Sequence, residues 1–111
     1  MSLPFEISAE EVKARLDAGE KLVLIDVREP FEHAIASVPG ATLIPMNTVP
    51  MQLSDLEAQA AANTLIVFCH HGMRSMNVVN WLRGQGVEEC QSMAGGIDAW
   101  SAVIDPSVPR Y

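Results

Sequence analysis

Six consecutive residues in the middle of the chain have the chemistry of a nucleophile inside an anion-binding loop. Cys69 directly follows an apolar run, Gly72 permits a tight turn, and a helix is expected to begin near Ser75. The backbone N–H groups of such a loop converge on one point, and the N-terminus of the following helix adds positive potential there. Together with the Arg74 guanidinium, these groups favour the thiolate form of Cys69 and hold an anionic substrate against its sulfur.

The other residues of the predicted substrate-binding loop are His70, His71 and Met73. The two imidazoles add hydrogen-bond donors or positive charge near neutral pH, but histidines in loops are more often exposed than catalytic. The Cys-His-His run also resembles a zinc site, yet adjacent ligands have awkward geometry and the sequence has no second cluster of Cys or His at a suitable spacing. We therefore expect no metal.

The length of the loop separates two kinds of chemistry. Cys69 to Arg74 is a run of six residues, whereas cysteine-dependent phosphatases use Cys-x5-Arg, which is longer by one. A smaller loop leaves less room around the sulfur, so a single outer sulfur atom on Cys69 fits better than a tetrahedral phosphate. The spacing favours a carrier of sulfane sulfur. A cysteine-dependent phosphatase or arsenate reductase, and a non-catalytic interaction module, stay open as alternatives.

Two apolar runs, Leu22–Ile25 and Leu65–Phe68, predict the strands that position this chemistry. Such continuous runs are typical of strands buried on both faces of a parallel sheet. Asp26 and Arg28 follow the first run as Cys69 follows the second, and ligands of open α/β sheets gather at the carboxyl ends of strands. If the strands are neighbours, Asp26 and Arg28 support the loop. For Asp26 a structural pairing is the favoured role. For Arg28 a structural role and the steering of an anion are about equally favoured.

Strands alternate with helices along the rest of the chain, which predicts an α/β domain with a mostly parallel sheet. Ser8 and Glu11 form a predicted capping box, and Gly19 is placed to end the first helix. The other predicted strands are Phe5–Ile7, Ala41–Pro45 and Glu89–Ser92. The other predicted helices are one turn at Pro30–His33, then Met51–Ala61, Ser75–Arg83 and Gly95–Trp100.

Composition narrows the class of protein. The 111 residues suit one domain, and the net charge of -7, from 14 acidic and 7 basic residues, argues against binding to nucleic acid. No apolar run approaches the roughly 18 residues of a membrane span, and residues 1–4 lack the pattern of a secretory signal. We therefore expect a cytoplasmic protein with no membrane association. Cys69 and Cys90 do not make a disulfide scaffold, and Cys90 is expected in the core.

Four segments resemble, in order, the motifs of the rhodanese-like family, and the resemblance extends from about Phe5 to Trp100. They are Asp-Val-Arg-Glu at 26–29, Pro-Gly-Ala at 39–41, Cys-His-His-Gly-Met-Arg-Ser at 69–75, and Met-Ala-Gly-Gly-Ile-Asp-Ala-Trp at 93–100. The resemblance implies a three-layer domain with a five-stranded, mostly parallel sheet flanked by helices on both faces. This single domain would comprise residues 1–111, with a core over about 5–100 and a C-terminal tail over 101–111.

The same resemblance implies a two-step transfer of sulfur. The Cys69 thiolate attacks the sulfane sulfur of a small anionic donor such as thiosulfate, sulfite leaves, and the loop N–H groups stabilise the persulfide. An acceptor then removes the sulfur: cyanide in an assay, or a thiol or an acceptor protein in the cell. Neither a metal nor an organic cofactor is implied.

The sequence departs from the family pattern at Ser37. Many members carry a histidine at this place, shortly before the Pro-Gly-Ala motif. We expect the change to affect local packing more than sulfur chemistry, and any role of that histidine is not carried over to this chain.

Overall fold

A parallel sheet forms the centre of the molecule, for which a computed structural model describes residues 3–111. The sheet has five strands in the order β1-β5-β4-β2-β3, and every neighbouring pair is parallel. The predicted five-stranded α/β fold is therefore confirmed. The strands are β1 (Glu6–Ile7), β2 (Leu22–Asp26), β3 (Thr42–Leu43), β4 (Thr64–Phe68) and β5 (Cys90–Met93).

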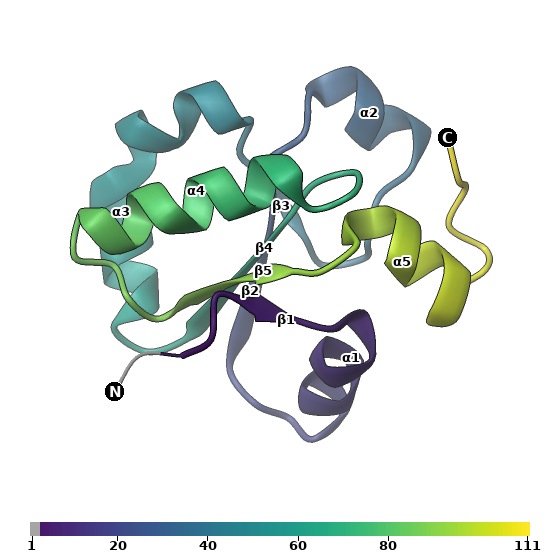
Figure 1. Cartoon of the computed structure of the whole chain (residues 1–111), viewed down its shortest axis with the longest axis horizontal. Helices are drawn as coiled ribbons and strands as arrows, with labels where there is room; N and C mark the ends of the chain where they lie inside the picture. The colour runs from purple at the N-terminus through teal and green to yellow at the C-terminus, as the bar shows by residue number, and fades with distance from the viewer. Residues whose placement is uncertain (1–2) are drawn as a thin grey trace.

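Helices cover both faces of the sheet, as Figure 1 shows. They are α1 (Ala9–Asp17), α2 (Pro30–Ile35), α3 (Leu53–Ala60), α4 (Met73–Gly84) and α5 (Gly96–Val103), with a 3-10 helix η1 (Met46–Gln52) before α3. Helices α1 and α5 pack on one face with one buried apolar cluster, and η1, α3 and α4 pack on the other face with a second cluster. The result is the three-layer arrangement expected from the sequence.

The central strand β4 decides where the nucleophile points. Leu65 and Val67 belong to the cluster under α3 and α4, whereas Ile66 and Phe68 belong to the cluster under α1 and α5. This alternation follows from the two-residue period of a strand, and all four side chains are fully buried. Each contributes about 1.5–3 kcal/mol through burial. Cys69 continues the alternation on the α4 side, so its sulfur is directed toward the start of that helix.

The predicted start of the first helix, α1, is confirmed, whereas the predicted start of α3 is wrong. Ser8 caps α1, because its Oγ accepts a hydrogen bond from the Glu11 N–H at 3.1 Å. The helix predicted over Met51–Ala61 begins only at Leu53. The residues before it form η1, which holds Pro50 and closes with a hydrogen bond from the Leu53 N–H to the Pro50 carbonyl. This tighter i+3 pattern is typical of short helical pieces at helix ends.

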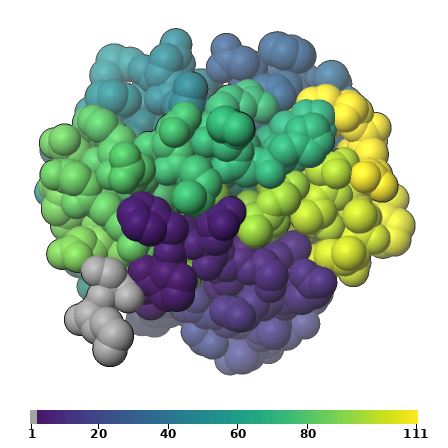
Figure 2. All heavy atoms as spheres, in the orientation of Figure 1, coloured from purple at the N-terminus to yellow at the C-terminus, as the bar shows by residue number. Residues whose placement is uncertain are grey.

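Residues 101–111, expected as a tail, begin inside α5 and fold back on the core. The Ser101 hydroxyl donates to the Val108 carbonyl at 2.5 Å, and Val108 is buried with the cluster under α1 and α5. In Figure 2 the C-terminal residues (yellow) lie against α5 and against the segment that precedes α4. Among the described residues, no helix is long and apolar enough to cross a membrane. Met1 and Ser2, which begin the segment examined for a secretory signal, lie outside the described residues.

Candidate active site

The sulfur of Cys69 lies in a cradle of backbone N–H groups. Its Sγ accepts hydrogen bonds from the Gly72 N–H at 3.1 Å and from the Ser75 N–H at 3.4 Å. Gly72 is the N-cap of α4 with φ of 115°, a left-handed conformation that favours glycine. The helix therefore begins at Met73, inside the loop and earlier than the predicted Ser75. Its positive end is directed at the sulfur, which favours negative charge there.

Two serine hydroxyls continue the hydrogen-bond network away from the sulfur. The Cys69 thiol donates to the Ser75 Oγ at 3.6 Å, and the Ser75 Oγ lies 2.6 Å from the Ser92 Oγ. Ser75 also donates to the Gly72 carbonyl at 3.1 Å, which closes the loop on itself. Both serines are completely buried. Ser92, on β5, was not predicted as a site residue, although its position at the end of the predicted strand Glu89–Ser92 was an available signal.

The first residues of α5 hydrogen-bond to the backbone of the loop. The Ile97 N–H donates to the Cys69 carbonyl at 2.8 Å, and the Asp98 N–H donates to the His70 carbonyl at 3.2 Å. Gly96 allows this approach, because a Cβ there would clash with both carbonyl oxygens, and its φ is 58°. The glycine pair in the last of the four motifs thus has a physical reason: one backbone must approach another closely.

Arg74 is held by a carboxylate that the sequence analysis did not identify. Its Nη1 and Nη2 donate to the Glu32 Oε2 and Oε1 at 2.7 and 3.0 Å. This bidentate pair lowers the pKa of Glu32 to about 2, although burial opposes the shift, and it raises the pKa of Arg74. The Arg74 side chain keeps 32% of its surface exposed. It lines a pocket of about 260 Å³ together with Val27, Glu29, Met46 and Asn47. Its role in binding an anion stays a prediction.

Asp26 and Arg28 form a buried ion pair beside the loop. Asp26 is in register with Phe68 of the neighbouring strand, as the proposed sharing of one sheet edge requires. Arg28 donates from Nε and Nη2 to the two carboxylate oxygens of Asp26 at 2.8 and 2.7 Å. Both side chains are 0% exposed, so Arg28 has no surface on which to steer an anion. Although burial opposes it, hydrogen bonding to Asp26 and Tyr111 raises the pKa of Arg28.

Tyr111 joins these two ion pairs to the loop, and sequence reasoning missed it. Its hydroxyl accepts from Arg28 Nη1 at 2.8 Å and donates to Glu32 Oε1 at 3.0 Å. Its ring stacks on His70 with centroids 3.9 Å apart. The position of Tyr111 in the sequence does not predict this contact, because the contact depends on how the last segment folds back.

The remaining loop residues differ in exposure. His70 is partly buried between Tyr111 and His71, and burial followed by the nearby His71 charge lowers the pKa of His70. His71 is exposed, and Met73 is 78% exposed. Ser37, which replaces the usual family histidine, is exposed between two buried residues. The packing effect expected from that replacement is therefore small.

Comparison with known proteins agrees with the fold. The sequence model of the family of rhodanese-like domains matches residues 8–103. The putative sulfurtransferase YtwF of Bacillus subtilis is 37% identical over 101 residues, which cover 91% of this chain and 94% of that protein. The crystal structure of a rhodanese-like domain protein from Staphylococcus aureus has a TM-score of 0.80 and 29% identity, over 97% of this chain and 99% of that one.

Other relatives are much longer. The chloroplastic rhodanese-like/PpiC domain-containing protein 12 of Arabidopsis thaliana is 36% identical over 110 residues, which cover 96% of this chain. The chain spans 37% of that protein and about a quarter of the length of several others. Because the family model covers most of the sequence and the fold agrees, the chain belongs to the family of rhodanese-like domains.

Proposed function

We propose that this chain is a sulfurtransferase that carries sulfane sulfur as a persulfide on Cys69. The observation that carries the proposal is the sulfur cradle, in which the N–H groups of Gly72 and Ser75 are directed at one cysteine sulfur. Such donors stabilise a negative sulfur before and after it takes up a second sulfur atom. The family and the name of the Bacillus subtilis relative, a putative sulfurtransferase, agree with it.

In the first step, the Cys69 thiolate attacks the outer sulfur of thiosulfate. A new S–S bond forms between Cys69 and that sulfur, the S–S bond of thiosulfate breaks, and sulfite leaves with its electron pair. The Arg74 side chain belongs to the loop, lines a pocket and is partly exposed, and it is the cation proposed to attract the donor. Close-range groups matter here, because the net charge of -7 opposes anions at a distance.

In the second step, a thiophilic acceptor attacks the outer sulfur of the persulfide. The bond between the two sulfurs breaks, and the electron pair returns to Cys69 as a thiolate that the same N–H groups stabilise. Cyanide would yield thiocyanate, and a thiol would become a persulfide. A small thiol or an acceptor protein is the proposed cellular acceptor. A reducing compartment such as the cytoplasm fits this cycle, since the attacking group is a free thiol.

Phosphate chemistry is the competing use of such a loop. The run from Cys69 to Arg74 has six residues, one fewer than the corresponding loop of cysteine-dependent phosphatases. A tetrahedral phosphate needs more donors and more room than one added sulfur atom. The loop therefore favours sulfur over phosphate.

Steady-state transfer from thiosulfate to cyanide tests the proposal, with thiocyanate as the measured product. We expect turnover by the wild type, none by Cys69→Ser, and wild-type turnover by Cys90→Ser, whose thiol lies in the core. Hydrolysis of a small aryl phosphate, measured in parallel, should be absent. Phosphate hydrolysis that disappears in Cys69→Ser, without any thiocyanate from the wild type, would replace sulfur transfer by phosphatase activity.

A further inference from the structure

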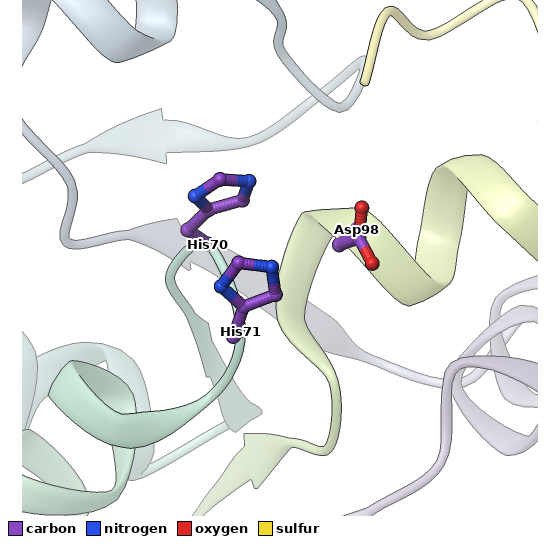
Figure 3. Close-up of side chains that lie close together, drawn as sticks. All are labelled: His70, His71 and Asp98. Carbon is purple, nitrogen blue, oxygen red and sulfur yellow. The ribbon is translucent and has the colours of Figure 1, made fainter. Parts of the chain in front are cut away.

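Three side chains that the sulfur chemistry does not use lie together beside the loop. They are His70 and His71, which follow the nucleophile, and Asp98 in the first turn of α5. One ligand atom from each residue lies within 4.8 Å of the others. Figure 3 shows the two imidazole rings stacked, each with one nitrogen on the side that faces the Asp98 carboxylate. Two imidazoles and a carboxylate are a common donor set for transition metals.

The backbone holds these residues at a fixed spacing. The Asp98 N–H donates to the His70 carbonyl, and the preceding Ile97 N–H donates to the Cys69 carbonyl. The close approach at Gly96 keeps α5 against the loop. To bind zinc, the side chains must rotate so that the ligand atoms approach to the roughly 3.3 Å that zinc–nitrogen bonds of about 2.0–2.1 Å require in a tetrahedral site. A preorganised donor set loses less conformational freedom when an ion binds.

His70 has a nitrogen in need of a partner. Its Nε2 is one of two buried side-chain nitrogens without a hydrogen-bond partner among the residues that the structure describes. Buried polar atoms are normally satisfied, so such an atom calls for an explanation.

A cation already lies on the third member of the cluster. Arg110 donates from Nε and Nη2 to the two oxygens of Asp98 at 3.0 and 3.1 Å. The Arg110 side chain is 60% exposed, and exposed ion pairs are weak. A divalent ion can therefore displace it from Asp98.

From this arrangement we propose that His70, His71 and Asp98 bind a divalent transition metal of borderline softness, such as Zn²⁺ or Co²⁺, in competition with Arg110. The remaining coordination positions would hold water. The proposal differs from the expectation of no metal, which considered the Cys-His-His run and a second cluster of Cys or His, because the fold brings the carboxylate of Asp98 to the histidines. It does not depend on sulfur transfer, although an ion bound there would lie next to the residue that performs it.

Titration of the tag-free protein with Co²⁺, followed by visible absorption, tests the site. Cys69→Ser should keep the d–d bands, because imidazole and carboxylate ligands are sufficient. We expect His71→Ala and Asp98→Asn each to weaken binding at least about 10-fold. Arg110→Gln should tighten it by about 2- to 5-fold, since it removes the competing cation. His33→Ala alters the only histidine outside the cluster and should leave the titration unchanged. Added Zn²⁺ should displace the cobalt.

Other results would overturn the proposal. A cobalt signal that disappears in Cys69→Ser would assign binding to the thiolate, and equal affinities of the wild type, His71→Ala and Asp98→Asn would place the ion elsewhere. Weaker binding by Arg110→Gln would contradict the competition. Thermal unfolding of each variant without metal serves as the folding control, and His71 is exposed, so its replacement should leave the fold intact.

Discussion

The two cysteines are alike in burial and packing but differ in the groups that hydrogen-bond to their sulfurs. Cys69 follows β4 and Cys90 begins β5, the neighbouring strand. Both are free thiols, they are 1% and 0% exposed, and they belong to the same apolar cluster. Burial and packing therefore do not explain why one of them should be a nucleophile.

The backbone around each sulfur makes the difference. Cys69 accepts hydrogen bonds from the N–H groups of Gly72 and Ser75, at the positive end of α4. Cys90 instead donates its S–H to the Val87 carbonyl at 3.3 Å, and burial raises the pKa of Cys90. N–H groups favour a negative sulfur, whereas a carbonyl oxygen favours the neutral thiol. The comparison identifies the backbone dipoles that the loop turns toward Cys69, rather than burial, as the basis of the proposed reactivity.

Alkylation should separate the two thiols most strongly. With a small reagent such as iodoacetamide at pH 7, we expect Cys69 to react at least about 100-fold faster than Cys90, since backbone N–H groups are directed only at the Cys69 sulfur. Peptide mapping over time measures both rates in one sample. In urea-unfolded protein the two rates should become similar. Equal rates in the folded protein would break the comparison.

Gly96→Ala tests whether the cradle depends on the close approach of α5. A Cβ at this position clashes with the carbonyls of Cys69 and His70, and the positive φ adds strain. We expect a loss of about 2 kcal/mol or more in unfolding free energy, and a large fall in the Cys69 alkylation rate with little change at Cys90.

Gly84→Ala is the matched control for that substitution. Gly84 ends α4, and a Cβ there would meet nothing within 4 Å. This variant should be as stable as the wild type or slightly more stable, by up to about 1 kcal/mol. Urea unfolding measures both variants. If Gly96→Ala behaved like Gly84→Ala, the close approach would not hold the loop.

Glu32→Gln tests the charge pairing that the Cys69 loop has and Cys90 lacks. It leaves the Arg74 guanidinium without its carboxylate, so we expect the unfolding free energy at pH 7 to fall by about 2 kcal/mol. In the wild type the folded-state pKa of Glu32 is lowered from 4.5 to about 2. Its stabilising contribution is then complete above about pH 4.5 and is lost as the pH falls toward 2.

The acid dependence of stability checks this sign. Urea unfolding between pH 4.5 and about 2 should show a smaller decrease in unfolding free energy for Glu32→Gln than for the wild type, because the variant has no carboxyl to protonate. Parallel curves over that range would mean that the Glu32–Arg74 pair contributes nothing to stability.

Ser92→Ala should have the smallest effect. It removes the hydroxyl that contacts Ser75 behind the sulfur, so we expect about 1 kcal/mol less stability and a Cys69 alkylation rate lowered only a few-fold. Ser37→Ala, at an exposed position away from that network, is the control. A loss of alkylation as large as that in Gly96→Ala would show that the hydroxyls, rather than the backbone N–H groups, activate the sulfur.

Local sequence patterns were sufficient for the strand, the cysteine and the loop. The apolar run before Cys69 and the flexibility of Gly72 predict a strand that enters an N–H cradle, and the parallel pattern predicts Asp26 beside it. Helix α4 nevertheless starts at Met73 rather than Ser75, because left-handed Gly72 serves as its N-cap. That choice depends on loop geometry that residue propensities do not encode.

The partners that reach the site through tertiary structure could not be predicted in this way. Glu32 meets Arg74 through the placement of α2, and Tyr111 reaches Arg28 only after the last segment folds back. Asp98 comes to the histidines through the approach of α5 at Gly96. These contacts depend on the relative positions of whole elements, about which the spacing of residues along the chain says little.

The most direct test of the account is the mass of the protein after treatment with thiosulfate, followed by peptide mapping of the two cysteines. We predict the addition of one sulfur atom, located on Cys69, absent from Cys90 and removed by cyanide. Cys69→Ser should gain no mass. An unchanged mass of the wild type, or a sulfur atom located on Cys90, would contradict the claim that the N–H cradle makes Cys69 the sulfur carrier.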